Sequence, residues 1–331
     1  MRIAVDAMGG DNAPLEIVHG AVKAARELDV KILLTGDKNA IDEILCGMDY
    51  PKDKIEIVPT TEVIANDETP TVAVRNKKDS SLVRCFTLVN EDRADAIVSA
   101  GSTGALLTAA VKYLKRLDGV LRPALGAVLP SQKGGVLIID SGANANCKSA
   151  YLKQFAIMGS IYAELVMKKT SPRVGLLSNG AEEGKGSDLV KEAYPLIKET
   201  PINFIGNFEA REVLEGTADV VVCDGFSGNV LLKATEGTGA VLLQEIKGLF
   251  MGSLLSKLCA LVLKKGLRTF KHKYDYQEYG GAPLLGVGGC VMKAHGSAKE
   301  KSVFHTIRIA NEFAKARVDK KIGDAIKNAE E

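Results

Sequence analysis

The sequence lacks the features that mark membrane-spanning, secreted and nucleic-acid-binding proteins. It has no apolar run of the ~18 residues that a spanning helix needs. Its N-terminus passes directly into strand-like sequence, without the charged, apolar and small-residue stretches of a secretion signal. Its net charge is only +2 over 331 residues, which gives no indication of nucleic-acid binding. We therefore expect a cytoplasmic protein with no nucleic-acid partner.

Metal and nucleotide motifs are also missing. The six cysteines and four histidines include no CxxC and no Cys/His cluster, so we expect no metal site, and scattered free thiols fit a reducing compartment. No GxGxxG follows the first predicted strand. The segment 180–187 is close to a nucleotide P-loop, but it has three residues between its glycines instead of four, and its two glutamates would repel a triphosphate. We therefore expect no cofactor.

Strands and helices alternate along the whole chain. Hydrophobic residues make up 46% of it and charged residues 25%, which is enough to bury a large core. Repeated strand–helix units predict an α/β fold with a doubly wound, mostly parallel, Rossmann-like sheet, and without long linkers residues 1–331 are expected to form a single unit. The last helix, over 298–326, is expected to begin with a capping box of Ser297 and Glu300. The predicted strands are 2–6, 31–35, 55–58, 95–99, 124–129, 135–140, 173–178, 203–206, 219–223 and 287–292.

Glycine is frequent, at 33 residues, and it gathers after the predicted strands. Because the carboxyl ends of parallel strands share one edge of a sheet, we expect these turns to line one crevice of main-chain donors and polar side chains, suited to phosphate. A single such turn is more often an ordinary connection capped by Ser, Asp or Asn. Six turns, at 6–11, 99–105, 140–144, 178–187, 224–229 and 279–296, are stronger support. The candidate phosphate- and substrate-binding residues are Asp6, Gly9, Gly10, Ser102, Thr103, Gly104, Asn144, Asn179, Asp224, Ser227 and Gly228.

Three further residues in or beside these turns are the main candidates for chemistry. Lys185, between glycines, would bring one ammonium to a phosphate-sized ligand, with a solvated surface lysine as the alternative. Asn229 opens a predicted helix, where capping and ligand binding are about equally expected. His295 lies between a strand and a glycine, which favours exposure in the crevice, although an isolated histidine is more often structural.

Seven ordered blocks of sequence resemble the phosphate acyltransferases of bacterial phospholipid synthesis, the PlsX family. The resemblance runs essentially from end to end and implies an enzyme that moves a long-chain acyl group from acyl carrier protein to inorganic phosphate. It also implies a fold like those of phosphate acetyltransferases and isopropylmalate-type dehydrogenases, a homodimer, and a membrane glycerol-3-phosphate acyltransferase that consumes the acyl phosphate. The blocks are 6–11, 99–105, 140–144, 182–186, 206–210, 224–237 and 279–298.

The implied reaction requires the protein to hold phosphate, aim it at the thioester carbonyl and stabilise the oxyanion. We assign phosphate binding to Lys185, and phosphate or oxyanion contacts to Asn229 and to the amides of its turn and of the 99–105 turn. His295 would donate to the leaving thiolate or orient a neighbour, and Asp224 would position Lys185 or a backbone turn. No metal and no acyl-enzyme are required.

Other functions remain open at this point. Cys147 and Cys223 flank two of the turns, but neither has a neighbour in sequence that signals an activated thiol. A coenzyme A-dependent phosphate acetyltransferase would share the fold and the chemistry. A dehydrogenase of the related fold should carry a nicotinamide site and a metal-and-carboxylate set. A non-enzymatic regulatory or scaffold protein would not need six polar turns.

Residues 247–273 carry seven Lys or Arg and no Asp or Glu. At helical periodicity one face is apolar and the opposite face is basic. Such a helix can lie on an anionic membrane surface or dock an acidic carrier protein, and burial in the core or against a partner subunit is the alternative. A coenzyme A-dependent enzyme should lack this segment. The apolar face carries Leu254, Leu258 and Leu261, the basic face carries Lys264 and Arg268, and Lys265 is an exception near the helix end.

Overall fold

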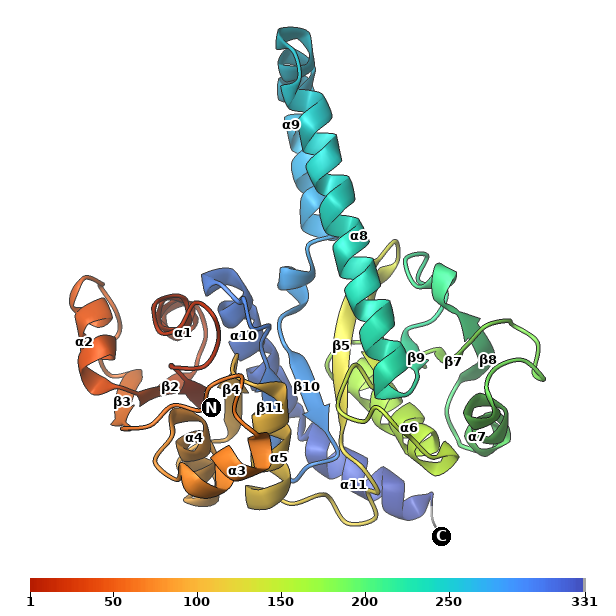
Figure 1. Cartoon of the computed structure of the whole chain (residues 1–331), viewed down its shortest axis with the longest axis horizontal. Coiled ribbons are helices and arrows are strands. Elements are labelled where there is room, and N and C mark those ends of the chain that lie inside the picture. The colour runs from red at the N-terminus through yellow and green to blue at the C-terminus, as the bar shows by residue number, and fades with distance from the viewer. Residues whose placement is uncertain (330–331) are drawn as a thin grey trace.

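All eleven strands form one continuous sheet with helices on both faces (Figure 1). The computed structural model describes residues 1–329, except for the side chains of residues 271, 272 and 276. The strand order is β3-β2-β1-β4-β11-β10-β5-β6-β9-β7-β8, and most pairings are parallel, which confirms the predicted fold class. The strands are β1 (Arg2–Asp6), β2 (Lys31–Gly36), β3 (Ile55–Pro59), β4 (Ala96–Ser99), β5 (Ala124–Ser131), β6 (Gly134–Ile139), β7 (Val174–Ser178), β8 (Phe204–Glu209), β9 (Val220–Val222), β10 (Ala282–Leu285) and β11 (Cys290–Lys293).

The sheet has two parallel halves that run in opposite directions. Strands β3, β2, β1, β4 and β11 are parallel to one another, and so are β6, β9, β7 and β8. Between the halves, β11 with β10, β10 with β5, and β5 with β6 are antiparallel pairs. These reversals place the carboxyl ends of the two halves at opposite edges of the sheet. The prediction that all six glycine-rich turns share one edge is therefore wrong, because three of them follow each half.

The strands are buried on both faces, and the helices pack against the sheet in two layers, one on each face. In β1, Ile3 and Val5 pack into one core with α1, α6, α10 and α11, whereas Ala4 packs into a second core with α3, α4 and α5. This alternation follows from the two-residue period of a strand. The helices are α1 (Leu15–Glu27), α2 (Lys38–Cys46), α3 (Pro70–Asn76), α4 (Ser81–Asn90), α5 (Thr103–Tyr113), α6 (Ser149–Leu165), α7 (Asp188–Lys198), α8 (Gly225–Met251), α9 (Leu254–Lys273), α10 (Glu300–Ala316) and α11 (Val318–Asn328).

Two predictions near the C-terminus are wrong. The single helix expected over 298–326 is divided into α10 and α11, because Arg317 adopts a φ of 52° between them. The expected capping box does not form, since Lys299 occupies the N-cap position without a side-chain cap. Ser297 instead places its Oγ 2.8 Å from Nδ1 of His295.

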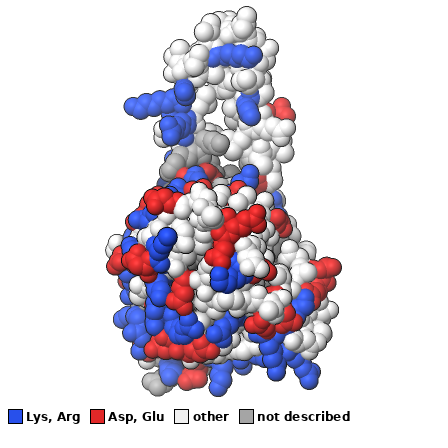
Figure 2. Space-filling view, turned by 90° about the vertical axis from the view of Figure 1, so that its left-hand side faces the viewer, with Lys and Arg blue, Asp and Glu red and all other residues white. Residues whose placement is uncertain are grey.

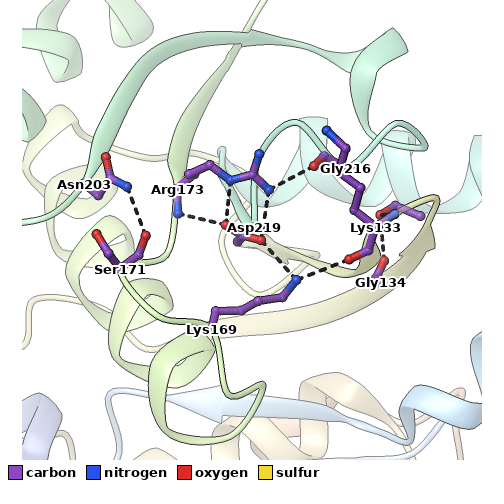
Figure 3. Close-up of polar contacts among 9 residues, drawn as sticks. Lys133, Gly134, Lys169, Ser171, Arg173, Asn203, Gly216 and Asp219 are labelled. Carbon is purple, nitrogen blue, oxygen red and sulfur yellow. Dashed lines mark hydrogen bonds and ion pairs between the residues drawn. The ribbon is translucent and has the colours of Figure 1, made fainter.

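An ion-pair network ties β7 and β9 to the β5–β6 hairpin (Figure 3). The Asp219 side chain is 9% exposed and pairs with Arg173 Nε at 2.9 Å and with Lys169 Nζ at 3.2 Å. Arg173 and Lys169 also donate to the backbone oxygens of Gly216 and Lys133. Burial raises the pKa of Asp219, but the hydrogen bonds from Arg173 and Lys169 outweigh this effect and lower the pKa to about 2.

Replacing Asp219 by asparagine is expected to lower the free energy of unfolding by about 2 kcal/mol at pH 7. The pKa of Asp219 is lower in the folded chain than in the unfolded chain, so its contribution is present above pH ~4 and lost as the pH falls toward 2. Denaturant unfolding at pH 7 and below pH 3 measures both effects. The matched control is Asp42→Asn, which breaks the exposed Lys38–Asp42 pair and should change stability by less than ~0.5 kcal/mol. Equal losses of unfolding free energy in the two variants would contradict a stabilising role for the Asp219 network.

Helices α8 and α9 form a hairpin that projects from the body of the molecule (Figure 1). Its apolar side chains are exposed, with Leu254 82%, Leu258 60% and Leu261 65% accessible. Figure 2 shows the hairpin surface as mostly uncharged or basic. Burial of this apolar face in the core of the same chain, one of the alternatives, is therefore wrong. No single described helix is long and apolar enough to cross a membrane; α8 with residues 254–270 meets that test only as a bent pair.

Candidate functional site

The turn after β1 is built around a buried carboxylate. Asp6 accepts hydrogen bonds from Ser99 Oγ at 2.7 Å and from the Met8 amide at 3.3 Å. Burial raises the pKa of Asp6, and these hydrogen bonds oppose that effect. A Cβ on Gly9 would lie 2.4 Å from Asp6 Oδ2, so the backbone can approach the carboxylate only with glycine at this position.

Three turns of the first half are packed against one another. Gly10 has a φ of 104°, and a Cβ there would lie 2.8 Å from Ala100 Cβ and 3.0 Å from the Gly296 oxygen. The Asp11 amide donates to the same Gly296 oxygen at 2.8 Å. The turns after β1, β4 and β11 therefore form one polar cluster, which we call the first cluster.

The N-terminus of α5 opens into the first cluster. Ser102 is its N-cap and accepts from the Ala105 amide at 3.5 Å. Within the described part of the chain, the amides of Thr103 and Gly104 have no hydrogen-bond partner. They lie at the positive end of the helix dipole, where anions are stabilised. Gly104 also has a packing role, because a Cβ would lie 2.7 Å from Pro70 on α3.

Two lysines that sequence reasoning missed stand beside His295. Lys293 is half-buried at the end of β11 and donates to the Ala100 oxygen at 3.1 Å. Burial lowers its pKa to about 8, partly opposed by Asp6 and other carboxylates. Lys233 of α8 places Nζ 3.3 Å from His295 Nε2. Burial, and then Lys233, lower the pKa of His295, so the imidazole is neutral at pH 7.

The turn after β6 is organised by Asp140. This fully buried carboxylate accepts from the amides of Leu125, Gly142, Ala143 and Asn144 at 2.7–3.1 Å. Asn144 Nδ2 donates to the same carboxylate at 2.8 Å and to the Pro123 oxygen at 2.7 Å. The side-chain amide of Asn144 therefore holds the turn together, which is a structural use of a predicted substrate-binding residue.

The start of α8 lies against this turn. The Gly225 amide donates to the Asn144 oxygen at 2.8 Å. Asp224 is the N-cap: Oδ1 accepts from the amides of Phe226 and Ser227 at 3.0 and 2.9 Å, and Oδ2 accepts from Ser227 Oγ at 2.8 Å. In this structure the amides of this turn that were expected to bind phosphate or the oxyanion are hydrogen-bonded within the protein. Asp224 caps α8, and no contact with Lys185 is found among the described residues.

Gly228 and Asn229 complete this second cluster. A Cβ on Gly228 would lie 2.0 Å from the Asp140 oxygen and 2.7 Å from Cys223 Sγ, so α8 packs against β6 with no room for a side chain. Asn229 is exposed and donates from Nδ2 to the Ser141 oxygen at 3.2 Å. Its side chain is thus held at the surface of the cluster.

The Lys185 loop follows β7 and is closed by two asparagines. Asn179 Oδ1 accepts from the Gly186 amide at 2.9 Å, and Asn207 Nδ2 donates to the Glu182 oxygen at 2.7 Å. Lys185 is exposed, and its side chain lies over Gly180. We find no ion pair of Lys185 within residues 1–329, so its ammonium is available to a ligand.

Helix α8 links the two clusters. It begins at Gly225 in the second cluster, and about 12 Å further along its axis Lys233 reaches His295 in the first cluster. Lys233 is also paired with Glu236 at 3.1 Å. Lys233 follows Asn229 by one helical turn, and this spacing in the sequence could have identified Lys233 as a candidate site residue.

Sequence comparisons decide the family. Residues 1–321 match the model of the FA_synthesis family, described as "Fatty acid synthesis protein". The chain is 49% identical over 326 residues to the phosphate acyltransferase of Alkaliphilus oremlandii, covering 98% of this chain and 97% of that one. It is 50% identical over 328 residues to the phosphate acyltransferase of Brevibacillus brevis, covering 98% and 97%. The chain belongs to this family of phosphate acyltransferases. It is therefore an acyltransferase with phosphate as a substrate, and its family belongs to lipid biosynthesis.

Solved structures share the fold of this acyltransferase. A phosphotransacetylase from Streptococcus pyogenes superimposes with a TM-score of 0.66 at 16% identity, covering 95% of this chain and 94% of that one. A branched-chain phosphotransacylase from Enterococcus faecalis gives a TM-score of 0.59 at 16% identity, covering 95% and 99%. At these identities the likeness establishes the fold alone, and it confirms the expected similarity to phosphate acetyltransferase folds.

The cysteines near the site of the phosphate acyltransferase are not activated nucleophiles. Burial raises the pKa of the Cys147 thiol to about 11 and that of Cys223 well above its usual value. Their thiols donate to the backbone oxygens of Asn144 and Asp140. Since the thiolate is the reactive form, neither side chain is suited to forming an acyl-enzyme.

Proposed function

We propose that this phosphate acyltransferase takes its long-chain acyl group from acyl carrier protein and releases acyl phosphate for phospholipid synthesis. The observation that carries the phosphate site is the α5 N-terminus. Its amides at Thr103 and Gly104 have no hydrogen-bond partner among the described residues and lie in the cluster that contains Lys293 and His295. An anion there would meet backbone donors and cationic side chains together.

The proposed reaction is direct transfer. A phosphate oxygen forms a bond to the thioester carbonyl carbon, the C–S bond breaks, and the carrier protein leaves as its thiolate. Phosphate is largely a dianion near pH 7 and a thiolate leaves without strong protonation, so no strong base or acid is needed. Asn229 lies one helical turn before Lys233, which contacts His295 of the first cluster, and it is proposed to contact the phosphate or the oxyanion. Lys185 lies in a turn of the other half of the sheet and is proposed to neutralise phosphate charge when the substrates are bound. Nε2 of His295 accepts from the Lys233 ammonium, so His295 orients Lys233, and the ammonium stabilises the thiolate.

Release of free thiol tests the donor. With phosphate present, acyl carrier protein thioesters should react at least tenfold faster than the same acyl group on coenzyme A. Omission of phosphate should stop the release. A preference for acyl-coenzyme A would favour the phosphate acetyltransferase alternative. Thermal stabilisation by NAD rather than by phosphate would favour a dehydrogenase.

The α8–α9 hairpin is proposed to hold the enzyme on an anionic membrane surface, near a membrane glycerol-3-phosphate acyltransferase that takes the product. Its exposed leucines can enter the interface, while its lysines and arginine meet anionic headgroups at ~1 kcal/mol each. The basic side chains Lys264, Lys265 and Arg268 are all exposed. A homodimer, as the family resemblance implies, would give each assembly two such hairpins.

Replacing Leu254 and Leu258 together by glutamate is expected to release the protein from anionic vesicles while turnover in solution is retained. Two large apolar groups are removed from the interface and two repulsive charges are added. Vesicle co-sedimentation measures the effect. Leu15→Glu with Val72→Glu is the control, since these side chains are also half exposed, at 50% and 53%, but lie on α1 and α3. Equal vesicle binding by parent and hairpin variant would exclude membrane attachment through these residues.

A further inference from the structure

A strongly basic surface lies beside the second cluster. Between positions 111 and 153 the chain has seven Lys or Arg and two carboxylates, of which Asp140 is buried. The other carboxylate, Asp118, lies 3.8 Å from Lys327. We define the basic rim by its four exposed cationic side chains, which are Lys115, Arg116, Arg122 and Lys148.

The rim is held rigidly by its own contacts. Arg122 stacks over the Tyr151 ring at 5.9 Å, on the first turn of α6, where Lys148 is the N-cap residue. Gln154 of the same helix accepts from the Leu121 amide at 2.8 Å and donates to the Gly119 oxygen at 2.9 Å. The loop before β5 and the start of α6 therefore present their charges as one surface.

Hydrogen bonds connect this surface to the candidate site. Pro123, next to Arg122, accepts from Asn144 Nδ2 at 2.7 Å, and the Asn144 oxygen accepts from the Gly225 amide at 2.8 Å. Phe226, at the start of α8, is 66% exposed. At the edge of the rim, a bound partner would therefore meet Phe226 and Asn229, which lie within one helical turn of each other on α8.

The loop of the rim also encloses a cavity. It has a volume of about 350 Å³ and is lined by Lys115, Arg116 and Asp118 together with Val111, Leu117, Gly119 and Val120. The lining is mostly polar, and its two cations outnumber its one carboxylate, which favours an acidic side chain. None of the predicted site residues lines this cavity.

We propose that the basic rim is the docking surface for the acidic carrier protein that delivers the acyl thioester. The inference rests on the proposed function, since it names the surface that the proposed donor uses. Opposite charge across an interface guides encounter and fixes orientation. The rim satisfies this for an acidic partner, and it lies next to the second cluster, whose Asn229 is proposed to contact the phosphate or the oxyanion.

The test is charge reversal with a matched control. Arg122→Glu with Lys148→Glu should raise the KM for acyl carrier protein by about tenfold or more, while kcat and the KM for phosphate change less than twofold. Binding of labelled carrier protein, measured by fluorescence anisotropy, should weaken equally and lose its salt dependence. Lys52→Glu with Lys78→Glu, two exposed lysines in the first half of the chain, should leave all these values unchanged.

Three outcomes would overturn the docking surface. They are an unchanged KM in the rim variant, an equal rise in the control, or a larger rise when Lys264 and Lys265 of the hairpin are reversed instead. If the rim variant fails to fold, Arg122→Gln with Lys148→Gln gives the same comparison with a smaller perturbation. Absence of phosphate-dependent thiol release by the parent enzyme would refute the proposed function, whereas release with unchanged rim variants would refute only the docking surface.

Discussion

Replacing Gly228 by alanine is expected to lower the free energy of unfolding by about 3 kcal/mol and to reduce turnover by at least tenfold. The added methyl would lie 2.0 Å from the Asp140 oxygen, which is backbone and cannot rotate away. Helix α8 must therefore shift away from β6, and this shift moves Asn229 and Lys233 together. Chemical denaturation and acyl-phosphate formation measure the two effects.

Gly237→Ala is the matched control on the same helix. No atom lies within 4 Å of the Cβ position at Gly237, and alanine favours helix over glycine by about 1 kcal/mol. This variant should be slightly more stable than the parent and equally active. If both alanine variants retain full activity, the close approach of α8 to β6 is not needed to place the site.

Replacing Lys185 by alanine is expected to lower acyl-phosphate formation by about 10²–10³-fold, the range seen when one oxyanion-hole donor is removed. The fold should survive, because Lys185 is exposed and its loop is closed by Asn179 and Asn207. Steady-state kinetics with varied phosphate separates charge stabilisation in the transition state from phosphate binding.

Lys191→Ala provides the comparison for Lys185, since it removes an exposed lysine from the adjacent helix α7. It should have wild-type kinetics. Near-normal kcat for Lys185→Ala at saturating phosphate, with only KM raised, would limit Lys185 to ground-state binding. Unchanged kcat and KM would show that Lys185 is not part of the site.

Much of the fold could be predicted from the sequence, because short apolar runs buried on both faces mark parallel strands clearly. Strand β10 was missed, since Ala282–Leu285 is short and contains a proline. The reversal of strand direction could not be predicted, because it depends on three antiparallel pairings, those of β10 with β11, of β10 with β5 and of β5 with β6, and local pattern does not encode the first two.

The residue types of the site could be predicted from the sequence, but not which of these residues lie together in the structure. Asp6, Asp140 and Asp224 follow strands as expected, yet each carboxylate organises its own turn. In the sequence, Lys293 is simply the last residue of an apolar strand. Only the structure shows that it lies among buried polar groups. Lys233 lies far from His295 in sequence, and their 3.3 Å contact depends on where α8 crosses the sheet.

The central claim is transfer of an acyl group from carrier protein thioester directly to phosphate. ³¹P NMR of the purified enzyme with acyl carrier protein and inorganic phosphate tests it in one experiment. The account predicts that an acyl-phosphate resonance grows at the expense of inorganic phosphate, in equal amount to the free thiol released, with no acylated cysteine on the enzyme. Thiol release without the acyl-phosphate resonance, or stoichiometric acylation of Cys147 or Cys223 in the absence of phosphate, would contradict it.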